Sequence, residues 1–210
     1  MAERHPDWVL GFADETWWSR LAQPQLHTWA DPDDGPLRLV EQEVPKADPD
    51  PKADPDPKAL ACYGLLLRRQ RGQPEHVWLR FVDGRPVSAL TEEFLAWGCT
   101  RLQEAGVRVW ALIWDNASWQ VSKRVRAWIH VHNQTVKRQG YGVRILSCYL
   151  PVKSPGLNPI EPKWVHGKRA IVEPARLLSA QEVADRVCAY HHCPHEAHLS
   201  LPGPILDKAS

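Results

Sequence analysis

No apolar run in the sequence approaches the roughly 20 residues needed to cross a bilayer, so no membrane partner is expected. The N-terminal MAERHPDW also lacks the basic-then-apolar pattern of a secretory signal, and we therefore expect a cytoplasmic protein. Five scattered cysteines do not make a disulfide framework, and most lie in or near apolar stretches, as reduced buried thiols do.

An overall basic excess is missing as well, because the formal net charge is only +1. Proteins that bind DNA through its phosphates usually show such an excess. The second half of the chain nevertheless holds local basic clusters. Tryptophan is abundant, with 11 in 210 residues, and most of these rings are expected to be buried or half-buried in the core.

Residues 46–59 read KADPDPKADPDPKA, a six-residue unit repeated twice and begun a third time. Proline at this density is incompatible with a helix or a paired strand. We expect an exposed loop without a chemical role.

The rest of the chain shows the pattern of a single α/β domain over residues 1–210. Apolar runs predict five strands, and helical periodicity predicts helices between and after them. The expected strands are 8–12, 60–67, 77–81, 107–114 and 143–150, and the expected helices cover 90–105, a stretch after Asp115, a short segment from Pro159, and a tail within 175–210 that begins at a capping box. Three successive strands followed by strand–helix alternation predict a five-stranded mixed sheet flanked by helices.

Two aspartates directly follow apolar strands: Asp14 after WVLGFA and Asp115 after VRVWALIW. If these strands are parallel neighbours, the two carboxylates meet at one edge of the sheet. Such a pair repels unless it is protonated or bridged by a cation, and Mg²⁺ or Mn²⁺ supplies that bridge. Either aspartate alone is more readily explained as a turn or helix-cap residue, but the matching positions favour a metal site.

A third carboxylate, Glu161, lies in the segment SPGLNPIEPKW. Asn158 is suited to cap a helix and Pro159 to its first position, which places Glu161 in the first turn. There it could complete a capping interaction or complement the helix dipole. A helix start after the last strand can equally bring Glu161 close to the two aspartates, and both interpretations stay open.

Three segments resemble the catalytic blocks of bacterial insertion-sequence transposases of the mariner superfamily, most closely the insertion sequence 630 family. They are FADETWW, WDNASWQVSKRVRAW and LPVKSPGLNPIEPKW, of which the third is the most specific and the first is weak by itself. The resemblance runs from about residue 8 to near the C-terminus, interrupted by the repeat loop. It implies an RNase H-like fold, with which the expected strand order agrees, and a catalytic metal-binding triad of Asp14, Asp115 and Glu161.

The resemblance further implies a DDE transposase that cleaves DNA and transfers strands with two Mg²⁺ or Mn²⁺ ions. Transposon ends and target DNA would be its partners on the bacterial nucleoid, together with a second copy of the chain. Basic residues past the second and third acids would contact DNA phosphates, unless they form ordinary solvated helix faces. These residues are Lys123, Arg124, Arg126, Lys163, Lys168 and Arg169. Trp119 and Trp164 flank the same site and would either stack on a base or pack in the core.

Two departures from the family pattern bear directly on activity. Gln120 stands where relatives often carry a histidine, and glutamine cannot take up a proton near neutral pH. No helix-turn-helix module precedes the first block, so we expect this module to be absent or separately encoded. The alternative is an inactive remnant that binds DNA or a full-length partner, and a third possibility is a stand-alone RNase H-like nuclease, against which the DNAS and LNPIE segments argue.

The stretch CAYHHCPHEAH near the C-terminus is rich in potential zinc ligands. They are Cys188, His191, His192, Cys193, His195 and His198. The Cys-x4-Cys spacing is unusual and no second ligand pair follows at the usual distance, which favours a half-exposed helix end with incidental histidines. His130 and His132, on the helix expected after Asp115, are interpreted as surface or satisfied half-buried residues.

Overall fold

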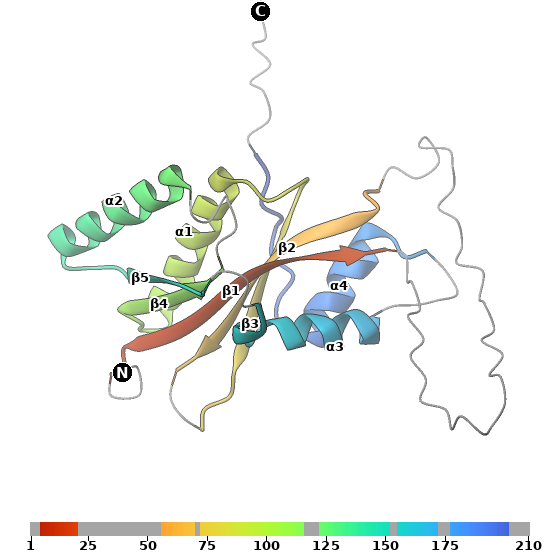
Figure 1. The fold of residues 1–210 in the computed structure, drawn as a ribbon, viewed down its shortest axis with the longest axis horizontal. Coiled ribbons are helices and arrows are strands. Elements are labelled where there is room, and N and C mark those ends of the chain that lie inside the picture. The colour runs from red at the N-terminus through yellow and green to blue at the C-terminus, as the bar shows by residue number, and fades with distance from the viewer. Residues whose placement is uncertain are drawn as a thin grey trace, which may run out of the picture.

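Figure 1 shows the protein as a computed structural model, which describes residues 5–20, 56–69, 72–115, 122–151, 155–171 and 177–201. In chain order the elements are β1 (Trp8–Ser19), β2 (Ala59–Arg68), β3 (His76–Val82), α1 (Ser88–Glu104), β4 (Val109–Trp114), α2 (Lys123–Gln139), β5 (Arg144–Tyr149), the 3-10 turn η3 (Pro155–Leu157), α3 (Glu161–Ile171) and α4 (Ala180–Tyr190). This order of strands and helices is the one expected from the sequence. No helix in the described part of the chain is long and apolar enough to span a membrane.

The five strands form one mixed sheet in the order β3-β2-β1-β4-β5. β1 pairs antiparallel with β2, which pairs antiparallel with β3. On its other side β1 pairs parallel with β4, and β4 pairs parallel with β5. The meander followed by parallel additions is therefore confirmed, and β1 is the strand that joins the two halves.

Alternating side chains divide the core into two clusters on opposite faces of this sheet. Along β2, Tyr63 and Leu65 belong to the first cluster, whereas Cys62 and Leu66 belong to the second. Helices α1 and α2 cover the first face, and α3 and α4 cover the second, so the sheet lies between two helical layers (Figure 1).

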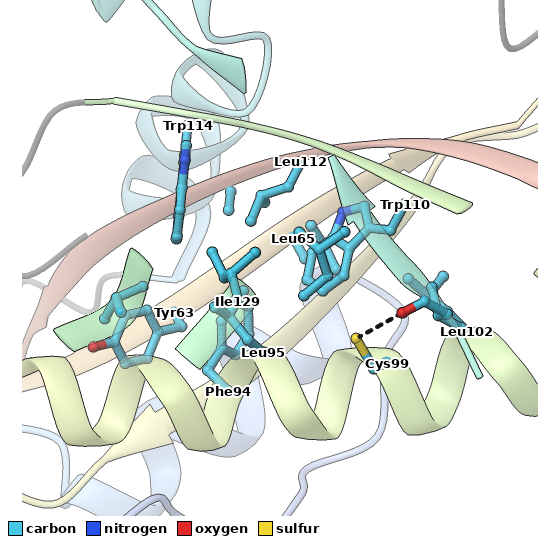
Figure 2. Close-up of a cluster of buried hydrophobic side chains, with 14 of the residues drawn as sticks. Tyr63, Leu65, Phe94, Leu95, Cys99, Leu102, Trp110, Leu112, Trp114 and Ile129 are labelled. Carbon is cyan, nitrogen blue, oxygen red and sulfur yellow. Dashed lines mark hydrogen bonds between the residues drawn. The ribbon is translucent and has the colours of Figure 1, made fainter. Parts of the chain in front are cut away.

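The first cluster consists largely of aromatic rings and leucines that pack between α1 and the sheet (Figure 2). Trp110 is fully buried above α1, and Gly11 and Gly98 leave room for its indole, because a Cβ at either position would lie within about 3 Å of the ring. Tyr63 stacks on Phe94 with ring centroids 4.9 Å apart. These contacts join α1 to β1, β2 and β4.

The second cluster covers only part of its face. Its strand residues come from β1, β2 and β3. On β4, Val109 and Ile113 point the same way and are only half-buried, whereas the small Ala111 between them is buried. The edge of the α3–α4 layer therefore runs along the boundary between β1 and β4.

Helix boundaries follow from local capping. The Ser122 side chain accepts a hydrogen bond from the backbone of Val125 and starts α2, which ends at Gly140 with a left-handed φ of 66°. Helix α4 begins with the expected capping box, in which Ser179 and Glu182 bond each other's backbone N–H groups.

Both sheet edges are partly covered. On β5, the Asn133 side chain from α2 donates to the Ile145 carbonyl at 2.8 Å and accepts from the Ile145 N–H at 2.9 Å. On β3, the segment after α4 crosses to the free side, where Leu199 bridges Val82 in parallel and bonds the Phe81 carbonyl at 2.8 Å. The tail expected as helical is thus helical only over Ala180–Tyr190 in the described part of 175–210.

Three sequence expectations need correction. Strand β1 does not end before Asp14 but continues to Ser19, because Thr16 and Trp18 remain buried and pair with β2. The third helix begins at Glu161 rather than at Pro159. Ala59 opens β2 instead of closing the repeat loop, whose residues 46–55 lie outside the described part of the chain.

Candidate active site

Asp14 and Asp115 are brought together by the parallel pairing of β1 and β4. Phe12 stands opposite Ile113 in this register, and two further residues along each strand lead to the two aspartates. Their side chains therefore face the same side of the sheet at the same height. Asp14 is 8% exposed inside β1, and Asp115 is half-buried directly after β4.

Glu161 is supplied by a third element, since it is the first residue of α3. The turn before α3 is tied to β1, because the Asn158 side chain donates a hydrogen bond to the Ala13 carbonyl at 3.1 Å and is almost fully buried. Its oxygen accepts from the backbone of Ile160 at 3.4 Å. Asn158 thus anchors the helix start next to Asp14, which is a different role from the helix cap expected from the sequence.

Trp164 connects α3 to the buried aspartate. Its indole Nε1 donates a hydrogen bond to Oδ2 of Asp14 at 2.8 Å. The ring can enter this position because Gly64 lies directly opposite Asp14 on β2, and a Cβ there would lie 2.2 Å from the ring. Trp164 is 2% exposed, so the alternative of core packing is confirmed over that of an exposed base-stacking residue.

Electrostatic interactions link the three acids. Burial raises the pKa of Asp14 to about 7, the hydrogen bond from Trp164 opposes this rise, and the negative charges of Glu161 and Asp115 add to it. Lys168 lies close enough to Glu161 and Asp14 for their negative charges to raise its pKa. Burial of the ammonium group has the larger effect, so the pKa of Lys168 is lowered overall. Residues 161, 164 and 168 share one face of α3 by helical spacing.

Three acids placed in this way suit a hard divalent cation. Burial and the two acidic neighbours raise the pKa of Asp14, and a bound cation would offset the repulsion among the three carboxylates. Within the described residues the acids are close without converging into a complete three-ligand metal site. The chemistry of the donors fits Mg²⁺ or Mn²⁺, whose oxygen ligands are typically completed by water and substrate phosphates.

A family model for the DDE superfamily endonuclease matches residues 78–183, just over half of the chain. The chain belongs to the DDE superfamily endonucleases. The matched span contains Asp115 and Glu161, and Asp14 precedes it. Among curated proteins, none matches the sequence.

The fold of this endonuclease domain is similar to that of solved Mos1 transposase structures. A crystal structure of the Mos1 mariner paired-end complex with Mn gives a TM-score of 0.56 at 15% identity, covering 89% of this chain and 48% of that chain. The crystal structure of the Mos1 strand transfer complex gives 0.51 at 15% identity, with 90% and 48% covered. The domain spans about half the length of the Mos1 chains, and the similarity shows the RNase H-like fold.

The basic residues expected to contact DNA lie at two places in the endonuclease. Lys123 and Arg126 are exposed in the first turn of α2, where Arg124 is already engaged with Glu92 through two hydrogen bonds of 2.8 and 2.9 Å. On α3, Lys163 forms an ion pair of 3.2 Å with Glu75. Lys168 and Arg169 are exposed near the end of α3, although the ammonium group of Lys168 is itself partly buried.

Several other sequence predictions either fall outside the described residues or are settled by the structure. Trp119 and Gln120 lie in the segment 116–121, which the structure does not describe. His130 is exposed, and half-buried His132 bonds the Val143 carbonyl at 2.8 Å, so the interpretation of both histidines is confirmed. All five cysteines are free thiols, as expected.

Sequence reasoning missed the contacts that hold Asp14 in place. The separation of three residues between Glu161 and Trp164 was a usable signal, because it places both on one face of a helix. Gly64 within an otherwise apolar strand was another, since glycine in a strand often marks a close approach by another group. Neither signal identified Asp14 as the residue to which Trp164 donates its hydrogen bond.

Proposed function

We propose that this domain is the catalytic domain of a transposase of the mariner superfamily, close to the insertion sequence 630 family, and that Asp14, Asp115 and Glu161 are its catalytic residues. The observation that carries the proposal is the placement of the three acids by three separate elements at one position beside the β1–β4 boundary. Membership of the DDE endonucleases supports DNA cleavage as the reaction.

The chain's own residues would bind and orient the reacting groups. Two divalent ions, when bound by the acids, would supply an activated water and stabilise the leaving oxygen of the phosphodiester. Asp14 is fixed from one side by Trp164, and the α3 start that carries Glu161 is fixed by Asn158, so both carboxylates are preorganised. Asp115 lies beside the part of the sheet face that the described helices α3 and α4 leave uncovered, which would give access to a DNA strand.

Partners follow from the same proposal. Transposon ends and target DNA would lie along the basic residues of α2 and α3, and two copies of the chain would act together in the bacterial cytoplasm. A separately encoded helix-turn-helix half would supply recognition of the ends. A solved Mos1 paired-end complex with the left transposon end supports DNA as the partner.

The test is cleavage of supercoiled plasmid by the purified chain with Mg²⁺ or Mn²⁺. Asp115→Asn should abolish metal-dependent nicking, because the amide cannot provide a charged ligand. Glu104→Gln, a change at an exposed acid on α1, is the matched control and should keep wild-type activity. Nicking that survives in a folded Asp115→Asn protein overturns the assignment of the triad. A folded wild-type chain that never nicks, even with Mn²⁺ and with a helix-turn-helix half supplied, supports the inactive remnant instead.

A further inference from the structure

A second group of candidate ligands lies away from the acids, where the segment after α4 crosses the end of β3. His195 and His198 approach each other there, with their Nε2 atoms 3.2 Å apart. Each histidine also contacts a carboxylate through its other ring nitrogen. His195 Nδ1 lies 2.7 Å from Asp185 of α4, and His198 Nδ1 lies 2.8 Å from Asp83 after β3.

These carboxylates fix the tautomers of both rings. A carboxylate accepts, so the neutral ring places its single proton on Nδ1 and leaves a lone pair on Nε2. Two Nε2 lone pairs therefore face each other at 3.2 Å, an arrangement that is repulsive unless a shared proton or a metal ion lies between them.

We propose that His195 and His198 form a binding site for a zinc-class transition-metal ion. Zinc binds imidazole nitrogen at about 2.0–2.1 Å, so two nitrogens 3.2 Å apart would subtend an angle of about 100–106° at the metal, close to tetrahedral. Ligating histidines usually donate their second N–H to a carboxylate, as both do here. Imidazole ligands suit Zn²⁺, Ni²⁺ and Cu²⁺ rather than Mg²⁺, which makes this site chemically distinct from the triad.

Contacts made by the residues around His195 and His198 hold this segment against the rest of the domain. Arg80 donates to the Ala197 carbonyl at 3.0 Å, Asp83 N–H bonds the Leu199 carbonyl at 2.8 Å, and Glu196 pairs with Arg101 at 2.5 Å. Both imidazoles pack beside the Phe81 ring and are 20% and 25% exposed. The site is therefore preorganised yet open to solvent.

Only two protein nitrogens are available, because the described residues contain no group of three potential ligands that could hold a metal. Water or an external ligand would complete the coordination. A bound ion would join the C-terminal segment to α4 and to the end of β3, since the supporting carboxylates come from those two elements.

The test is isothermal titration of the chelator-treated full chain with Zn²⁺ in the presence of millimolar Mg²⁺, alongside Co²⁺ absorption spectra that report nitrogen ligation. The expected result is one Zn²⁺ per chain in wild type and no binding at this site in the double variant His195→Gln and His198→Gln. Asp185→Asn keeps both ligands and should weaken Zn²⁺ binding about 10–100-fold. His130→Ala, at an exposed histidine on α2, is the matched control.

Two further variants separate other zinc sources. Cys188→Ser with Cys193→Ser should retain the binding, and so should Asp115→Asn. Loss of binding in either of these, or wild-type binding that survives in the double histidine variant, overturns the proposal. A wild-type chain that binds no Zn²⁺ also overturns it, and leaves a hydrogen bond between the two histidines as the explanation of their proximity.

Discussion

Trp164 donates its indole N–H to the carboxylate of Asp14 across 150 residues of sequence. The bond links the first strand to the third helix at the position of the proposed metal site. It also opposes the rise in the Asp14 pKa that burial produces, and so favours the charged form that binds a cation.

Trp164→Phe keeps most of the ring and removes the donor. We expect the concentration of Mn²⁺ needed for half-maximal nicking to rise about 10–100-fold, as for other residues that support a metal ligand. Trp18→Phe is the control, because Trp18 packs edge-on against Trp164 but leaves the donor to Asp14 in place. Equal metal dependence in wild type and Trp164→Phe would show that this hydrogen bond has no functional role.

Asp14→Asn should change the pH dependence of stability in metal-free protein. A folded-state pKa of about 7, above the ordinary value of 3.8, stabilises the fold at low pH, and this contribution is lost as pH rises from about 4 to 7. The variant should therefore gain stability over wild type across this range, by at most about 4 kcal/mol. Urea unfolding at several pH values measures the difference.

The comparison isolates Asp14 because the other titrating groups are present in both proteins. His191, whose pKa burial lowers to about 4, acts in the opposite sense: its contribution is present above the ordinary value of 6.5 and is lost as pH falls. Added Mg²⁺ should reverse the order of stability at about pH 8 by binding wild type alone. A difference curve that is flat with pH contradicts the burial argument.

Gly64→Ala tests the space that admits Trp164. A Cβ at this position would lie 2.2 and 2.4 Å from two ring atoms, so the indole must shift. We expect a loss of about 1–3 kcal/mol in the free energy of unfolding, together with reduced nicking. Gly156→Ala is the control, because nothing lies within 4 Å of its added Cβ. Wild-type stability in Gly64→Ala would mean that the ring has another position available.

The double variant Lys123→Ala and Arg126→Ala tests the interaction between α2 and DNA. Both side chains are exposed in the first turn of α2, and the removal of each phosphate interaction should lower the log–log slope of DNA affinity against salt by about one. Lys137→Ala with Arg138→Ala, at the other end of α2, is the matched control. Fluorescence anisotropy at several salt concentrations measures both. Identical slopes for the two double variants would argue against this surface as the one that binds DNA.

The sequence was sufficient for the order of elements and for a mixed sheet, whereas the parallel pairing that brings Asp14 and Asp115 together entered only as a condition. It was insufficient for the extent of β1, because Asp14 and Glu15 interrupt the apolar pattern and imitate the end of a strand. The burial of Trp18 depends on residues of α3 and α4, which lie far along the chain. Local periodicity contains no information about such tertiary partners.

The candidate zinc ligands show the same limit. Within the sequence the segment CAYHHCPHEAH suggests its cysteines as readily as its histidines. The structure selects His195 and His198 through Asp185 and through Asp83, which is 115 residues away from His198. A ligand pair supported by carboxylates from distant elements cannot be identified from spacing alone.

Asn133 and the Leu199 segment occupy the outer hydrogen-bonding positions of the two edge strands. An uncovered edge strand is a template for pairing with another chain and a common origin of aggregation. The amide of Asn133 imitates a neighbouring strand for Ile145, and the backbone of Leu199 does the same for the end of β3. Each edge is thereby blocked at one point against pairing with a neighbouring molecule, which disfavours a continuous intermolecular sheet.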